Sequence, residues 1–395
     1  MINLEDPGRF RELVANAHLA AEHLLRPISR KYDRAEHEYP HELDDLAALI
    51  DGLAAAEAGR EPGPGDPAAT RNGSHLASVL SVAEMCWGDV GMLLSLPRRG
   101  LGNAAISAVG TEDQQRRFAG AWAAMAITEP EAGSDSAAVR TTAVLDGDHY
   151  VLNGEKIYVT SGDRCDVVVV WATLDRALGR AAIKPFVVPK GTPGLTVERL
   201  ERKLGIRVSD TAALRLTDCR VPAENLLGSP ELDPSSGFGG VLTTFDHTRP
   251  VVAAMAVGCA RAALDRTREL LGAAGVEVDY DRRPLVQSAA AAELLRLEAE
   301  WESARLLMLQ AAWMADNGRP NSLEASMAKA KAGRVGSDVT LSCVELAGQV
   351  GYAEEELLEK WARDSKILDI FEGTQQIQLL IVARRLLGLS SAELR

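Results

Sequence analysis

The hydrophobic periodicity of this chain changes twice along its 395 residues, and this change restricts the fold more than any other feature. The middle of the chain carries short apolar runs separated by Gly, Pro and Asp, as in strands. Long Ala-rich and Leu-rich stretches typical of helices follow it. Near the start, apolar residues recur every three or four positions, as on one helix face: Phe10, Leu13, Ala17, Ala20 and Leu24. We therefore predict three successive regions: helical, β and helical.

The predicted fold class is α+β, with three domains. Residues 1–124 form an N-terminal helical domain, in which Pro27 interrupts or restarts a helix. Residues 125–235 form a middle domain, an antiparallel β-barrel or sandwich. Residues 236–395 form a C-terminal four-helix-bundle domain. A Pro-rich and Gly-rich polar stretch at 59–73 is predicted to be a loop.

Residue types place the strands of the middle domain. The segments 150–152 and 156–160 flank Asn153-Gly154, a dipeptide typical of tight hairpin turns, so we predict a hairpin there. Further strands are expected at 167–172, 185–188, 195–197 and 213–216.

Composition excludes several classes of function. A net charge of −13 argues against a nucleic-acid-binding surface, although local cations and helix N-termini can still hold an anionic cofactor. Five scattered cysteines without a CxxC pair predict neither a zinc site nor a disulfide framework. No segment approaches the roughly 20 apolar residues of a membrane span, and the first residues do not resemble a secretory signal. We predict a cytoplasmic protein without a metal site.

A carboxylate near the C-terminus is the first candidate for chemistry. Glu372 follows a mostly apolar run and precedes Gly373, a setting in which partial desolvation would raise its pKa and make it a better general base. Thr374 is expected to cap the helix that follows. From the local pattern alone, a charge that complements the helix dipole is the commoner explanation for Glu372.

A second candidate is the segment from Ala126 to Asp135. Its Gly-Ser-Asp, with hydroxyls on Thr128 and Ser134, could present backbone N–H groups to a phosphate or a flavin. By itself, a polar turn before the first strand explains this segment equally well. It is not a Walker loop, because no Gly-Lys-Ser/Thr follows.

Taken together and in order, these segments resemble the acyl-CoA dehydrogenase family. The resemblance spans about Leu13 to Leu387, and each motif would be weak alone. It is carried by ITEP (127–130) with GSD (133–135), LNGEKIYVT (152–160), KLGIR (203–207) with SDT (209–211), VPAENLLG (221–228), RP (249–250) and FEGT (371–374).

The resemblance implies an activity and a cofactor. FAD would bind between the β domain and the C-terminal bundle. Glu372 would remove the α-proton of an acyl-CoA thioester while the β-hydrogen leaves as hydride to flavin N5, giving a trans-2-enoyl-CoA. The backbone N–H of Glu372 and a ribityl hydroxyl of FAD would bind the thioester carbonyl. An electron-transfer flavoprotein would then accept the electrons.

The resemblance also assigns roles to individual positions. Some relatives carry the base one residue before an arginine like Arg249; here that position is Thr248, which leaves Glu372 as the candidate base. Tyr158 would pack against the isoalloxazine. The implied cofactor-binding residues are Ile127, Thr128, Gly133, Ser134, Tyr158, Thr160, Thr374 and Gln376. The implied substrate-binding residues are Ser134, Asp246, Arg249, Gly373 and Arg384.

Two segments depart from the family pattern. Residues 275–287 lack an Arg-x-x-Phe-Gly motif that, in relatives, reaches the FAD of a neighbouring subunit. Glu345 begins a segment, 345–349, where relatives have Gln and a Gly-Gly pair, and a carboxylate facing a pyrophosphate is repulsive. Two assemblies follow: a homo-oligomer, dimer or tetramer, with a remodelled FAD site, or a hetero-oligomer in which a paralogue completes the site. A non-catalytic or half-site subunit is the alternative function, and an acyl-CoA oxidase is a third.

Overall fold

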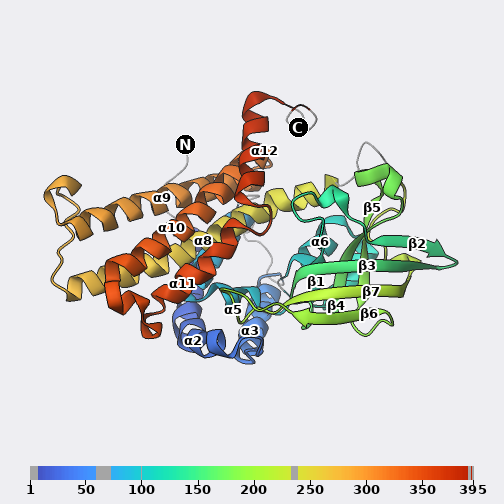
Figure 1. Cartoon of the computed structure of the whole chain (residues 1–395), viewed down its shortest axis with the longest axis horizontal. Coiled ribbons are helices and arrows are strands. Elements are labelled where there is room, and N and C mark those ends of the chain that lie inside the picture. The colour runs from blue at the N-terminus through green and yellow to red at the C-terminus, as the bar shows by residue number, and fades with distance from the viewer. Residues whose placement is uncertain (1–7, 59–72, 99, 233–238, 390–392, 394–395) are drawn as a thin grey trace.

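The computed structural model describes residues 8–58, 73–98, 100–232, 239–389 and 393. A helical bundle lies at one end of the molecule and a β-sheet at the other, with N-terminal helices beside the bundle (Figure 1). The elements follow the predicted order of helical, β and helical, which confirms the α+β fold class. The loop predicted at 59–73 lies, apart from Gly73, outside the described residues.

Helices make up the first region. Leu13 and Leu24 of the predicted apolar face are exposed, whereas Ala21 and Leu25 are fully buried. A π-helical turn at Ala21–Leu25 shifts the helix register at this point. Pro27 lies in the first turn of the next helix, where the missing N–H costs no hydrogen bond. The helices are α1 (Arg11–Ala20), α2 (Arg26–Ala35), α3 (Glu42–Ala58), α4 (Ser74–Gly88), α5 (Val90–Leu94), α6 (Leu101–Val109) and α7 (Glu112–Phe118).

The middle region is one curled seven-stranded sheet with spatial order β1-β4-β2-β3-β7-β6, and β5 pairs with β4. Most neighbours are antiparallel, as predicted, but β1 runs parallel to β4. The strands are β1 (Ala123–Ala126), β2 (Thr142–Asp146), β3 (His149–Thr160), β4 (Val167–Thr173), β5 (Ile183–Pro189), β6 (Leu195–Leu200) and β7 (Thr211–Pro222).

The hairpin predicted at Asn153-Gly154 is wrong, because β3 runs through this dipeptide without turning. The pairing of β3 with β7 shifts register at this point, so the dipeptide marks a bulge. A Cβ at Gly154 would overlap Thr141, and close approach of two backbones therefore explains the glycine. The actual hairpin joins β2 to β3 through Gly147, which has φ +66°.

The C-terminal region contains α8 (Gly239–Ala273), α9 (Ala289–Asp316), α10 (Ser322–Tyr352), α11 (Leu358–Ser365) and α12 (Gln375–Leu387). The three long helices pack together, and α12 extends away from them at the edge of the bundle (Figure 1). Small residues allow close packing: Gly258 of α8 lies against the backbone of Ala83 in α4, and a Cβ there would overlap the Ala83 carbonyl. Within the described ranges, no helix is long and apolar enough to cross a lipid bilayer.

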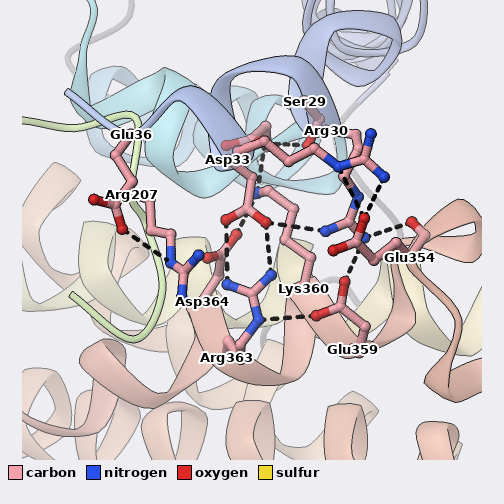
Figure 2. A network of polar contacts seen from close by, with 12 residues as sticks. Ser29, Arg30, Asp33, Glu36, Arg207, Glu354, Glu359, Lys360, Arg363 and Asp364 are labelled. Atoms are coloured by element: carbon pink, nitrogen blue, oxygen red, sulfur yellow. Dashed lines mark hydrogen bonds and ion pairs between the residues drawn. The ribbon is translucent and has the colours of Figure 1, made fainter. Parts of the chain in front are cut away.

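A buried ion cluster joins the three regions. Nζ of Lys360 in α11 donates to Asp89 Oδ2 at 2.7 Å and to Asp364 Oδ2 at 2.5 Å, and all three side chains are almost fully buried. Asp89 also caps α5, and Ser29 of α2 donates to it. Figure 2 shows Ser29, Lys360 and Asp364 in this region. Asp364 Oδ1 accepts from the backbone N–H of Ile206 at 2.5 Å. Burial alone would lower the pKa of Lys360, but the two carboxylates more than offset this and raise it.

We expect Lys360→Met to reduce the free energy of unfolding by about 3–5 kcal/mol, because it leaves two carboxylates buried without their cation. Urea denaturation monitored by circular dichroism measures this. The matched control is Arg116→Met, since Arg116 pairs with Asp113 on an exposed helix surface and should contribute less than about 1 kcal/mol. Equal losses for the two variants would contradict the prediction.

Candidate active site

Glu372 lies in a left-handed turn between a short 3-10 segment (Lys366–Asp369) and α12. Its φ is +52°, and that of Gly373 is +92°. A positive φ is uncommon for a residue other than glycine, so the surrounding structure must hold it. Thr374 caps α12 as predicted, with Oγ1 accepting from the N–H of Ile377 at 3.4 Å.

The carboxyl of Glu372 is desolvated. Its Oε2 is buried and has no hydrogen-bond partner among the described residues, although the residue as a whole is half-buried. Burial raises the pKa of Glu372, and the Thr248 hydroxyl and the positive charges of Lys329 and Arg249 oppose this rise without cancelling it. Thr248, the alternative base position in some relatives, therefore lies beside Glu372.

Two buried side chains donate hydrogen bonds to the backbone carbonyls of this turn. Lys329 of α10 donates from Nζ to the carbonyl of Gly373 at 2.6 Å. Gln378 of α12 donates from Nε2 to the carbonyls of Glu372 at 3.0 Å and Gly373 at 3.2 Å. A Cβ at Gly373 would overlap this amide, so glycine is required here by space as well as by its φ.

The predicted substrate residues on α8 form a pair. Arg249, which is buried, donates from Nη1 to Asp246 Oδ1 at 2.6 Å. Burial lowers the pKa of Arg249, and the charges of Asp246 and Glu372 oppose that shift. In the structure, Asp246, Arg249 and Glu372 thus lie close enough for their charges to interact, and their roles toward substrate stay predictions. On α12, Gln376 is exposed and Arg384 is half-buried two turns further on.

The predicted cofactor residues of the β region form a second group. Ile127 and Thr128 follow β1 and are half-buried, and the carbonyl of Thr128 accepts from the N–H of Ile157 at 2.9 Å. Tyr158 has φ +58° and is 63% exposed at a bulge of β3, two residues before half-buried Thr160.

Two further positions, Gly133 and Ser134, are exposed in the segment between β1 and β2. Within the described part of the chain, no recorded hydrogen bond or ion pair joins them to the Glu372 turn. The structure therefore leaves their predicted role with FAD and substrate as an expectation from the resemblance.

An ion pair that the sequence pattern did not predict fixes the segment after β1. Lys156 is fully buried, and its Nζ donates to Glu129 Oε1 at 2.7 Å and to the Ile127 carbonyl at 3.0 Å. Glu129 also accepts from the backbone N–H groups of Arg140 and Thr141. Burial lowers the pKa of Lys156 to about 8, although Glu129 opposes this. Both charged residues belong to the family motifs ITEP and LNGEKIYVT, but their polar neighbours Thr128 and Glu155 give no sign that they are buried.

Comparisons with known proteins agree on a family. The model of the acyl-CoA dehydrogenase middle domain matches residues 124–219, and that of the acyl-CoA dehydrogenase C-terminal domain matches residues 235–387. A short-chain specific acyl-CoA dehydrogenase of Clostridium acetobutylicum is 35% identical over 320 residues, covering 79% of this chain and 82% of that protein. The chain belongs to the acyl-CoA dehydrogenase family.

Two solved structures extend this likeness over nearly the whole chain. Butyryl-CoA dehydrogenase from Megasphaera elsdenii is 32% identical with a TM-score of 0.84, covering 98% of this chain and all of that one. A chain in a structure described as the electron transferring flavoprotein of Acidaminococcus fermentans is also 32% identical, with a TM-score of 0.83 and the same coverage. Members of the acyl-CoA dehydrogenase family are oxidoreductases, and membership implies FAD as the cofactor.

The residues of the β region fit a flavin. The exposed ring of Tyr158 offers a flat apolar face, and the hydroxyls of Thr128 and Thr160 can meet the polar edge of an isoalloxazine.

The divergent segment 275–287 is folded by its own contacts, since the Gln287 amide bridges the backbone of Asp279 and Arg282. Arg282 pairs with Asp279 at 3.2 Å, and Glu345 is exposed on α10.

The raised pKa of Glu372 predicts how stability changes with pH. The ordinary Glu value is 4.5, and the folded state holds the proton more strongly than the unfolded chain. Stability is therefore lost as pH rises from 4.5 through the raised folded pKa. Glu372→Gln cannot ionise and should escape this loss, so its Tm should rise relative to wild type between pH 4.5 and the neutral range. A Tm difference that does not change with pH would contradict the raised pKa.

Proposed function

We propose that this chain catalyses the α,β-dehydrogenation of an acyl-CoA thioester to a trans-2-enoyl-CoA, with Glu372 as the catalytic base. The observation that carries this proposal is the desolvated carboxyl of Glu372 in a chain of this family. A raised pKa makes the carboxylate a stronger base, and Oε2 is free to take a proton. Thr248 cannot act as a carboxylate base, so the alternative base position of some relatives offers no competitor.

The turn also supplies a donor for the thioester carbonyl. The N–H of Glu372 has no hydrogen-bond acceptor in the part of the chain that the structure describes. A fixed, unpaired N–H next to the base can stabilise the charge that develops on the thioester oxygen when the α-proton leaves. Base and donor belong to one residue, so they are positioned together.

FAD, when bound, would accept the hydride from the β-carbon. Thr128 and Thr160 would hydrogen-bond its ring and Tyr158 would pack against it, with Ile127, Gly133, Ser134, Thr374 and Gln376 as further cofactor-binding positions. Ser134, Asp246, Arg249, Gly373 and Arg384 would contact the acyl-CoA. The buried Lys156–Glu129 pair supports this arrangement because it fixes the backbone that carries Ile127 and Thr128.

An electron-transfer flavoprotein is the proposed electron acceptor. The likeness to a chain from the electron transferring flavoprotein structure supports this choice. We further propose a homo-oligomer, dimer or tetramer, in the cytoplasm. The exposed apolar side chains Leu379, Leu386 and Leu387 on α12 support an assembly that covers them.

Glu372→Gln should abolish bleaching of the flavin by acyl-CoA while FAD stays bound, because removal of a general base costs about a hundredfold to ten-thousandfold in rate. Stopped-flow absorbance of the holoenzyme, mixed with a panel of straight and branched acyl-CoAs, measures the rate and also finds the preferred chain. The matched control is Glu112→Gln at an exposed position on α7, which should bleach like wild type. Retained bleaching in Glu372→Gln would refute the assignment of the base.

A half-site subunit of a hetero-oligomer is the second candidate, and the altered 275–287 and 345–349 segments favour it. If the chain binds FAD as a homo-oligomer, protein expressed alone should carry close to one FAD per chain, measured by absorbance after denaturation. A ratio near zero, restored by a co-expressed paralogue, would instead show that a partner completes the site.

A further inference from the structure

We propose that Lys329 is a positioning residue for the reaction: it fixes the left-handed turn that carries the base and supplies a positive charge that acts on the Glu372 carboxylate. This inference rests on the proposed function only in taking Glu372 as the base. Its geometric basis is the 2.6 Å hydrogen bond from Lys329 Nζ to the Gly373 carbonyl, in the middle of a buried helix face.

The way Lys329 is paired distinguishes it from the other buried lysines. Lys156 and Lys360 each donate directly to a carboxylate at 2.7 Å, which is how a buried ammonium is normally compensated. Lys329 is 1% exposed, and among the described residues it makes no ion pair within 4.0 Å. Its recorded hydrogen-bond partner is a carbonyl of the turn that carries the base. A buried charge placed in this way is compensated only at longer range.

Two carboxylates, Asp369 and Glu372, provide the longer-range compensation. Burial lowers the pKa of Lys329 to about 8, the charges of Asp369 and Glu372 oppose this, and Arg249 adds to it. Asp369 is already paired with Lys366 at 3.0 Å, and Arg249 with Asp246 at 2.6 Å. Glu372 is thus the remaining carboxylate in this group without a direct cation partner. The Glu372 and Lys329 charges therefore stabilise each other.

The hydrogen bond also has a geometric consequence. Peptide groups are planar, so holding the carbonyls of Glu372 and Gly373 fixes the two peptide planes on either side of Gly373. Lys329 and Gln378 hold these carbonyls from α10 and α12. The backbone of the turn is therefore held by hydrogen bonds from two helices. Misplacement of a catalytic group by about 1 Å can cost on the order of a hundredfold in rate.

Two variants separate charge from hydrogen bonding. Lys329→Met removes both, whereas Lys329→Gln removes the charge and keeps an amide donor. The control is Lys331→Met on the same helix, because Lys331 is partly exposed and pairs with Glu300, away from the turn. Infrared titration of the purified protein follows the ionisation of Glu372, identified by the carboxyl band that is lost in Glu372→Gln. The pH dependence of kcat/KM for flavin reduction follows the same group during turnover.

We expect both Lys329 variants to move the ionisation of Glu372 to higher pH, since the positive charge that acts on its carboxylate is lost. Above that ionisation, Lys329→Met should still lose at least about tenfold in kcat/KM because the turn is loosened, and Lys329→Gln should lose less. Lys331→Met should change neither quantity. An ionisation of Glu372 that is the same in Lys329→Gln and Lys331→Met would overturn the proposal.

The test of Lys329 remains decisive if one variant does not fold or if the wild type is inactive. Should Lys329→Met fail to fold, as judged by its circular dichroism melt, Lys329→Gln carries the same test. Should wild type fail to reduce its flavin with any acyl-CoA, the proposed function is wrong. The infrared titration still decides the role of Lys329 in that case, because it needs no substrate.

Discussion

The buried contact between Lys360, Asp89 and Asp364 is the constraint on which the arrangement of the three regions depends. Lys360 and Asp364 belong to α11, Asp89 begins α5, and the N–H of Ile206 from the β region completes the cluster. A second set of charges lies beside it: Arg363 pairs with Asp33 of α2 (Figure 2). Arg363 also donates to the Leu204 carbonyl. Buried ion pairs add little net stability, but they tolerate no misplacement, so they specify one packing. Because α11 leads directly into the 3-10 segment and Glu372, this cluster also determines where the base lies.

Backbone strain occurs in both segments that the family resemblance associates with chemistry. Glu372 and Tyr158 both have a positive φ, near +52° and +58°. Such conformations cost free energy and persist only where neighbouring groups hold them. At Glu372 these groups are Lys329 and Gln378, each from a different helix. At Tyr158 the bulge of β3 against β7 holds the backbone conformation, and the ring is exposed.

Much of the fold could be predicted from the sequence because it depends on local patterns. Helix periodicity located the long C-terminal helices, and the hydroxyl of Thr374 located the cap of α12. The hairpin prediction at Asn153-Gly154 was wrong because the glycine is needed for close packing against Thr141, and this contact forms only in the tertiary structure. The Lys156–Glu129 pair was missed for a related reason: neither residue shows from its neighbours that it is buried. Glu372 became the candidate base only through the order of several motifs, since its local pattern alone favoured a helix-start charge.

The strength of the base is a property of the tertiary structure. Burial pushes the pKa of Glu372 upward, while Thr248 and Arg249 of α8 and Lys329 of α10 pull it back. A carboxylate with an ordinary pKa would be a weak base toward a thioester α-proton, and one raised too far would stay protonated and accept nothing. The useful pKa range lies between these limits. The opposing residues, Lys329, Arg249 and Thr248, all lie more than 40 positions before Glu372 in the sequence. Packing of α8 and α10 against the turn therefore determines the chemistry of Glu372 as much as the residue itself does.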